Sequence, residues 1–152
     1  MEKSAFKDIV MSVYDVAVIG AGVVGASVAR ELSKYRLRIA LLEKEFELAF
    51  GVSKSNSGII HPGTQIDPKL LKGRLCVEGN RLVRSLSKAL CCDFKEVGEL
   101  IVAFNDEEKA RLFDIMGDAK VLGVPGVKIL EGDELFKAEP NLNSQAIAAL
   151  YA

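Results

Sequence analysis

The spacing of apolar positions predicts a strand, a helix and a second strand in the first fifty residues. Residues 14–19 form a short apolar run that ends at a glycine, which is typical of a buried parallel strand. Between residues 23 and 34 the apolar positions recur every four residues, which predicts a helix with one apolar face. These positions are Val24, Val28 and Leu32. Residues 38–42 form a second apolar run, so the segment predicts one βαβ unit with parallel strands.

The middle of the chain predicts a long loop followed by a long helix. Residues 46–67 are rich in Gly, Ser, Asn and Pro, and a loop of this kind is typically functional or disordered. Asp67 and Pro68 predict the helix start, as N-cap and first helical residue, and a leucine face extends to Leu90. Gly79 replaces a bulky residue on that face, which predicts a close approach by a backbone or a ligand.

After residue 93 the pattern no longer follows that of a doubly wound fold with a parallel sheet. It predicts a strand at 97–104, a helix from Asn105 or Asp106 to Gly123, an extended piece at 127–130, a short helix at 132–138 and a strand at 146–151. This order is typical of an antiparallel sheet with helices. The predicted fold class is therefore α/β, a Rossmann-like βαβ unit followed by the start of an α+β domain.

Glycines at G-x-G-x-x-G spacing follow the first predicted strand and open the predicted helix: Gly20, Gly22 and Gly25. Gly20 permits a tight turn, Gly22 lets backbone N–H groups approach a pyrophosphate, and Gly25 lets helix and strand pack closely. The N-terminus of the helix adds the partial positive charge that a diphosphate needs. Glu43 ends the second strand, where its carboxylate can accept hydrogen bonds from ribose hydroxyls and would repel a 2′-phosphate. The motif predicts a dinucleotide site but does not separate NAD from FAD.

Composition narrows the function classes. The chain is 49% hydrophobic and carries a net charge of −1, which indicates a globular protein without an electrostatic footprint for nucleic acid. No apolar run is long enough to predict a transmembrane segment. Three cysteines and one histidine favour neither a disulfide framework nor a metal site, so we expect no metal and a reducing, cytoplasmic compartment.

Four segments carry a resemblance to a known family. Residues 14–45 (YDVAVIGAGVVGASVARELSKYRLRIALLEKE) resemble the opening of FAD-dependent oxidoreductases of the D-amino-acid oxidase superfamily. Residues 55–63 (SNSGIIHPG) and 72–80 (KGRLCVEGN) resemble its glycerol-3-phosphate dehydrogenase and L-2-hydroxyglutarate oxidase branch. Residues 139–151 (EPNLNSQAIAALY) resemble the stretch that enters the substrate domain. The resemblance implies FAD as cofactor. It also implies oxidation of a small-molecule hydroxy acid or polyol phosphate, most like glycerol 3-phosphate, by hydride transfer to the flavin.

The resemblance also implies roles for individual residues. The three glycines would contact the FAD pyrophosphate, and Glu43 the adenosine ribose. The loop after the second strand would pass close to the cofactor, through Ser53, Ser55, Asn56, Ser57 and Gly58. Short hydroxyl and amide side chains with exposed backbone N–H groups suit phosphate and flavin edges.

His61, the single histidine, lies in the same loop and is expected near the flavin ring. It could help abstract the proton of a substrate hydroxyl while hydride moves to flavin N5. The alternative is a histidine that only packs against the cofactor or hydrogen-bonds to it. The sequence leaves both roles open.

Two parallel strands are too few for an open, doubly wound sheet covered on both faces. We therefore expect the N-terminal portion of a longer protein. Its predicted parts are an extension at 1–12, the N-terminal part of an FAD-binding domain at 13–93 and a partial substrate domain at 94–152. Exposed apolar surface would favour a homo-oligomer or a partner chain that completes the fold. Two other functions stay open: a non-catalytic nucleotide-binding module that needs a partner, and a less favoured NAD-dependent dehydrogenase.

Overall fold

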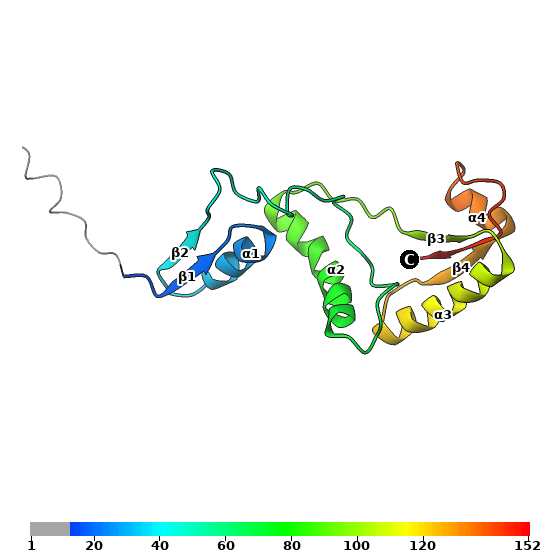
Figure 1. Ribbon diagram of the computed structural model, residues 1–152, viewed down its shortest axis with the longest axis horizontal. Helices are drawn as coiled ribbons and strands as arrows, with labels where there is room; N and C mark the ends of the chain where they lie inside the picture. Colours follow the sequence, from blue (N-terminus) through cyan, green and yellow to red (C-terminus); the bar gives the residue numbers. More distant parts are fainter. Residues whose placement is uncertain (1–12) are drawn as a thin grey trace, which may run out of the picture. The chain divides into compact units, whose positions relative to one another are not determined.

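The computed structural model describes residues 13–152 (Figure 1). The extension predicted at residues 1–12 lies outside these described residues. The chain divides into two compact units, Met1–Ile59 and Ile60–Ala152, called here the N-terminal and the C-terminal unit. This division does not test the domain boundary predicted after residue 93, which stays a prediction. Within residues 13–152, no helix is both long and apolar enough to cross a membrane.

The N-terminal unit contains the predicted βαβ unit. Its elements are β1 (Val16–Ile19), α1 (Val23–Leu32) and β2 (Ile39–Leu42). β1 and β2 pair in parallel, with Val16 opposite Ile39 and Ile19 opposite Leu42. The Gly20 N–H donates to the Leu42 carbonyl at 2.7 Å, so the pairing continues one residue past β1, into the glycine turn. This hydrogen bond ties the start of the turn to the end of β2.

The C-terminal unit contains a long helix, then a small sheet with two helices. Its elements are α2 (Leu71–Leu90), β3 (Leu100–Ala103), α3 (Asp106–Leu122), β4 (Lys128–Glu131), α4 (Gly132–Ala138) and β5 (Ala148–Tyr151). The strand order is β3-β5-β4 with both pairs antiparallel (Figure 1). The predicted antiparallel sheet with helices is confirmed, although β3 and β5 are shorter than predicted.

The core of the C-terminal unit lies on both faces of its central strand, β5. Successive side chains of a strand point to opposite faces of the sheet. Ala148 and Leu150 accordingly pack with Leu112 of α3, whereas Ala149 packs with Leu135 of α4. The two helices thus cover opposite faces of one sheet.

The ends of the helices show where local signals decide the structure. The Asn105 side chain accepts a hydrogen bond from the Glu108 N–H at 2.9 Å and caps α3, and Gly123 ends that helix at φ +79°. The predicted bounds of this helix, from Asn105 or Asp106 to Gly123, are confirmed. The predicted start of α2 at Pro68 is wrong, because Asp67 instead forms a turn with its side chain accepting from the Lys69 N–H. The helix begins at Leu71.

Within the described residues, the close approach on α2 occurs at Gly73, and the approach of a ligand to Gly79 stays a prediction. Apart from its chain neighbours and the backbone of its own helix, no described atom lies within 4 Å of the position that a Cβ on Gly79 would occupy. A Cβ on Gly73 would lie 2.9 Å from Leu122 Cδ2 and 3.2 Å from the Asp67 carbonyl oxygen. Gly73, near the start of α2, therefore permits the packing against the end of α3.

Candidate functional site

The glycine turn between β1 and α1 depends on backbone conformation at one glycine and on close packing at another. Gly20 has φ +95°, a left-handed conformation that favours glycine. A Cβ on Gly25 would lie 1.9 Å from the Gly20 carbonyl oxygen and 3.4 Å from Val18 Cγ1. The absence of a side chain at Gly25 therefore lets α1 start directly against β1, as the motif predicts.

The first turn of α1 presents unused backbone donors. The Val23 N–H donates to Ser53 Oγ at 2.9 Å. Among the described residues, the N–H groups of Gly22, Val24 and Gly25 have no hydrogen-bond partner. Such donors, together with the positive end of the helix dipole, form a site for an anion.

Glu43 lies at the end of β2, and its carboxylate binds the glycine turn. Oε2 accepts from the Ala21 N–H at 2.7 Å, and Oε1 accepts from the N–H groups of Lys44 at 2.8 Å and Glu45 at 3.1 Å. The hydrogen bond from Ala21, and next that from Glu45, hold the pKa of Glu43 below its ordinary value. A carboxylate accepts about four hydrogen bonds, so this ionised group keeps capacity for a ligand hydroxyl.

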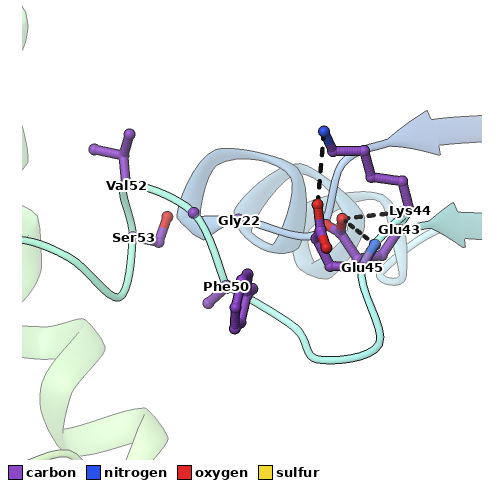
Figure 2. Close-up of a pocket in the computed structure, with 9 residues that line it drawn as sticks. Gly22, Glu43, Lys44, Glu45, Phe50, Val52 and Ser53 are labelled. Atoms are coloured by element: carbon purple, nitrogen blue, oxygen red, sulfur yellow. Dashed lines mark hydrogen bonds and ion pairs between the residues drawn. The ribbon is translucent and has the colours of Figure 1, made fainter.

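These groups meet at a recess of about 250 Å³ that is lined by Gly22, residues 43–45 and residues 49–53. Figure 2 shows the Glu43 carboxylate beside Lys44 and Glu45, with Phe50 and Ser53 on the loop that follows. A Cβ on Gly22 would lie 3.0 Å from Ser53 Oγ, so the absence of a side chain there leaves room for Ser53 beside the glycine turn. The recess therefore has both the glycine turn, at Gly22, and the acceptor carboxylate of Glu43 in its lining.

The polar loop predicted to contact a cofactor contributes one of its five residues to this recess. Ser53 lines it, whereas Ser55, Asn56, Ser57 and Gly58 do not. Asn56 holds the loop itself: Oδ1 accepts from the Gly58 N–H at 2.7 Å, and Nδ2 donates to the Ser53 carbonyl at 2.8 Å. Sequence reasoning missed residues 49–52 of the lining, because small and apolar side chains in a loop carry no chemical signature.

His61 lies in the C-terminal unit, at a second recess of about 280 Å³ within that unit. Its Nδ1 is 3.8 Å from Glu99 Oε2, and 67% of its side chain is exposed. Glu99 also accepts a hydrogen bond from Thr64 Oγ1 at 2.6 Å. Sequence reasoning missed Glu99, which lies within the strand predicted at 97–104 and shares no local pattern with His61.

Comparison with protein families gives one match over nearly the whole chain. The model described as "DAO: FAD dependent oxidoreductase" matches residues 15–152. A glycerol 3-phosphate dehydrogenase from Caloramator mitchellensis is 43% identical over 139 residues, which are 91% of this chain and 29% of the relative. A mitochondrial L-2-hydroxyglutarate dehydrogenase from Dictyostelium discoideum is 39% identical over 134 residues, which are 86% of this chain and 30% of that relative.

A solved structure has a similar fold. It is the dithionite-reduced L-α-glycerophosphate oxidase from Mycoplasma pneumoniae with FAD bound, with a TM-score of 0.81 and 32% identity. The similarity covers 91% of this chain and 37% of that one. The chain thus spans about a third of the length of these relatives.

Proposed function

The chain belongs to the family of FAD-dependent oxidoreductases, and from that premise we propose that it supplies the ADP-binding site of an enzyme similar to glycerol-3-phosphate dehydrogenase. That enzyme would oxidise the CH–OH group of a small hydroxy substrate. The observation that carries the proposal is the recess lined by Gly22, Ser53 and Glu43, at the start of the helix whose first N–H groups are unused. The alternative hypothesis of an NAD-dependent dehydrogenase has no support from the family match, which names FAD.

The residues at the recess fit the ADP part of FAD in charge and in hydrogen-bonding type. The N–H groups of Gly22, Val24 and Gly25 would donate to the pyrophosphate oxygens. Ser53 Oγ accepts from Val23 in this structure, so its hydroxyl hydrogen is available to a phosphate oxygen. Glu43 would accept from an adenosine ribose hydroxyl with the capacity that its three backbone donors leave unused.

FAD, when bound, supplies the acceptor for the hydride that leaves the substrate carbon. His61 is our candidate for the base that takes the hydroxyl proton, through Nε2 of the neutral imidazole. Ser55, Asn56, Ser57 and Gly58 stay candidates for cofactor contact, supported by the family membership and by their position in the loop after β2. Asn56 would act through the loop conformation that its hydrogen bonds hold.

Titration of the purified chain with ADP, followed by calorimetry, tests the binding site. We expect ADP to bind, and Gly22→Val to weaken binding about tenfold or more, because a branched side chain would cover the donors of the turn. Gly117→Ala in α3 is the matched control, since its Cβ would meet no described atom within 4 Å apart from its chain neighbours and its own helix backbone. Absence of ADP binding, or equal binding by Gly22→Val with α1 intact by circular dichroism, would contradict the proposal.

The substrate is tested by flavin reduction in the FAD-loaded protein. We propose glycerol 3-phosphate rather than L-2-hydroxyglutarate, a choice supported by 43% identity to a dehydrogenase of the first and 39% to one of the second. Glycerol 3-phosphate should bleach the flavin absorbance faster than L-2-hydroxyglutarate does. The reverse order would overturn the choice of substrate and leave the ADP site untouched.

We propose further that the protein is cytoplasmic and forms a homo-oligomer or pairs with a partner chain. Free thiols at Cys76, Cys91 and Cys92 support a reducing compartment. Exposed apolar side chains such as Ile19 and Val24 in the N-terminal unit support association. Cell fractionation and light scattering test the two proposals, and a strictly monomeric protein that gains no partner in cells would contradict the second.

A further inference from the structure

A carboxylate faces the imidazole of His61 within the C-terminal unit. Glu99 Oε2 lies 3.8 Å from His61 Nδ1, and the two residues come from different segments, the loop before α2 and the residue preceding β3. The Glu99 side chain is 24% exposed, whereas the His61 side chain is 67% exposed. The carboxylate is therefore the fixed partner, and the imidazole is the partner that can turn.

Glu99 is fixed through both its side chain and its backbone. Oε1 accepts from the hydroxyl of Thr64 at 2.6 Å, and Thr64 is 3% exposed. The Glu99 N–H donates to the Ala152 carbonyl at 2.8 Å, and the Ala152 N–H donates back at 3.1 Å. Beside it, a Cβ on Gly98 would lie 2.7 Å from the Tyr151 ring. These contacts leave Oε2 as the oxygen directed toward His61.

The backbone of His61 is held against α2. Its carbonyl accepts from Asn80 Nδ2 at 3.2 Å and from Cys76 Sγ at 3.4 Å. Gly63, at φ +107°, packs so closely that a Cβ there would lie 2.8 Å from Val77 Cγ2. With the backbone held, rotation about the side-chain torsions of His61 is the motion that shortens the 3.8 Å separation to a hydrogen bond. Pairs of this kind are often long in the ligand-free state and tighten in the complex.

We propose that Glu99 is a positioning residue for His61, with Thr64 holding Glu99 in place. Glu99 Oε2 accepts a hydrogen bond from Nδ1–H, which selects the neutral tautomer that is protonated at Nδ1. Nε2 then carries the lone pair that accepts a proton, and the carboxylate stabilises the imidazolium that results. The inference rests on the proposed role of His61 as base, and it adds the residues that prepare it.

The tautomer of His61 can be measured without ambiguity, because the chain has one histidine. Nitrogen NMR of the ¹⁵N-labelled chain distinguishes Nδ1–H from Nε2–H in the neutral ring. In Glu99→Gln the amide oxygen can keep the Thr64 hydrogen bond, while the amide nitrogen donates to Nδ1 and favours the opposite tautomer. We expect the ratio of Nδ1–H to Nε2–H to fall about tenfold, as loss of a charge-assisted hydrogen bond predicts.

Glu96→Gln is the matched control, because Glu96 pairs with Arg84 at 2.8 Å and has no contact with His61 among the described residues. Its tautomer ratio should equal that of the unmodified chain. Thr64→Val, which keeps the side-chain shape, should lower the ratio in the same direction by less than Glu99→Gln does. It serves as the second variant if Glu99→Gln fails to fold. An unchanged ratio in both variants would overturn the proposal.

Turnover of the FAD-loaded protein separates this proposal from the proposed function. Glu99→Gln should lower kcat for glycerol 3-phosphate and leave KM nearly unchanged, because it alters the base and not the binding groups. If His61→Asn keeps full turnover, His61 is not the base, and the proposed catalytic role fails whatever the tautomer ratio. A fall in the ratio with unchanged kcat in Glu99→Gln would overturn the positioning role alone.

Discussion

The two units of the chain are stabilised in different ways. In the C-terminal unit, helices α3 and α4 cover both faces of the sheet, and Leu135 and Leu150 are fully buried. Ala21 is the only buried residue among the described residues of the N-terminal unit. Ile19 is 86% exposed there, and Val24 is 74% exposed. The first unit is therefore held by backbone hydrogen bonds and glycine geometry, the second by side-chain burial.

The two recesses are also built from different groups. The recess at Gly22 is formed by backbone donors and by a carboxylate that itself binds backbone N–H groups. The recess at His61 is lined by the loop before α2, by α2 itself and by Glu99, and includes the hydrogen bond between the side chains of Thr64 and Glu99. Substitutions should therefore affect the two units through different mechanisms, which the following predictions test.

The largest effect is expected from truncation in the core of the C-terminal unit. Leu150→Ala should lower the free energy of unfolding by about 2–5 kcal/mol, because it leaves a cavity on the α3 face of β5. Val24→Ala in α1 should change it by less than about 0.5 kcal/mol, because that side chain is largely exposed. Urea unfolding followed by circular dichroism measures both. Equal losses would contradict the comparison between the units.

The second effect concerns the glycine turn. Gly25→Ala would place a Cβ 1.9 Å from the Gly20 carbonyl oxygen, so α1 must shift from β1 at a cost of about 1–3 kcal/mol. Hydrogen exchange measured by mass spectrometry should show lost protection in α1 with the C-terminal unit unaffected, together with lost ADP binding. Gly79→Ala is the control, since its Cβ meets no described atom within 4 Å and should not destabilise α2. Normal protection of α1 in Gly25→Ala would show that the turn tolerates a side chain.

The turn was predictable because its information is local. The spacing of Gly20 and Gly25 encodes a backbone path over six residues, and the cap at Asn105 likewise involves a partner three residues away. The start of α2 was not predictable from Asp67 and Pro68, because those residues support a turn as well as a helix N-terminus.

Longer-range features could not be read from the sequence. The close approach at Gly73 is set by Leu122 of α3, and the position of Glu99 beside His61 is set by pairing with Ala152. Both depend on how separate elements pack, which no local pattern contains. The candidate recess was therefore predicted at Gly22 and Glu43, while Phe50 and its neighbours in the lining were found only in the structure.

A smaller effect is expected at the cap of α3. Asn105→Ala removes the acceptor for the Glu108 N–H and should cost about 1 kcal/mol in the free energy of unfolding of the C-terminal unit. Asn105→Asp keeps an acceptor oxygen and should cost much less. Thermal unfolding of the two variants measures the difference. Equal losses in both would mean that the side-chain hydrogen bond contributes nothing to α3.

The smallest effect compares one carboxylate from each unit as the pH falls. The pKa of Glu43 is lowered mainly by the Ala21 N–H, and that of Glu78 in α2 mainly by its hydrogen bond with Arg81. Because folding lowers both pKa values, each group stabilises its unit above the ordinary glutamate pKa of about 4.3. This stability is lost as the pH falls through the lower, folded value. In Glu43→Gln and in Glu78→Gln, the stability of the unit that carries the substitution should therefore fall less steeply as the pH is lowered. Hydrogen exchange measures this stability for each unit separately.

Salt distinguishes the two causes. Glu78 and Arg81 are exposed charges, so added salt of about 1 M, where the screening length is about 3 Å, should remove most of the difference between Glu78→Gln and the unmodified chain. Glu43 is held by backbone N–H groups, whose hydrogen bonds do not depend on a second mobile charge. The difference in stability between Glu43→Gln and the unmodified chain should therefore persist in the same buffer. Loss of both differences in salt would mean that Glu43 is stabilised by long-range charge rather than by the glycine turn. The N-terminal unit would then no longer be the one organised by its backbone.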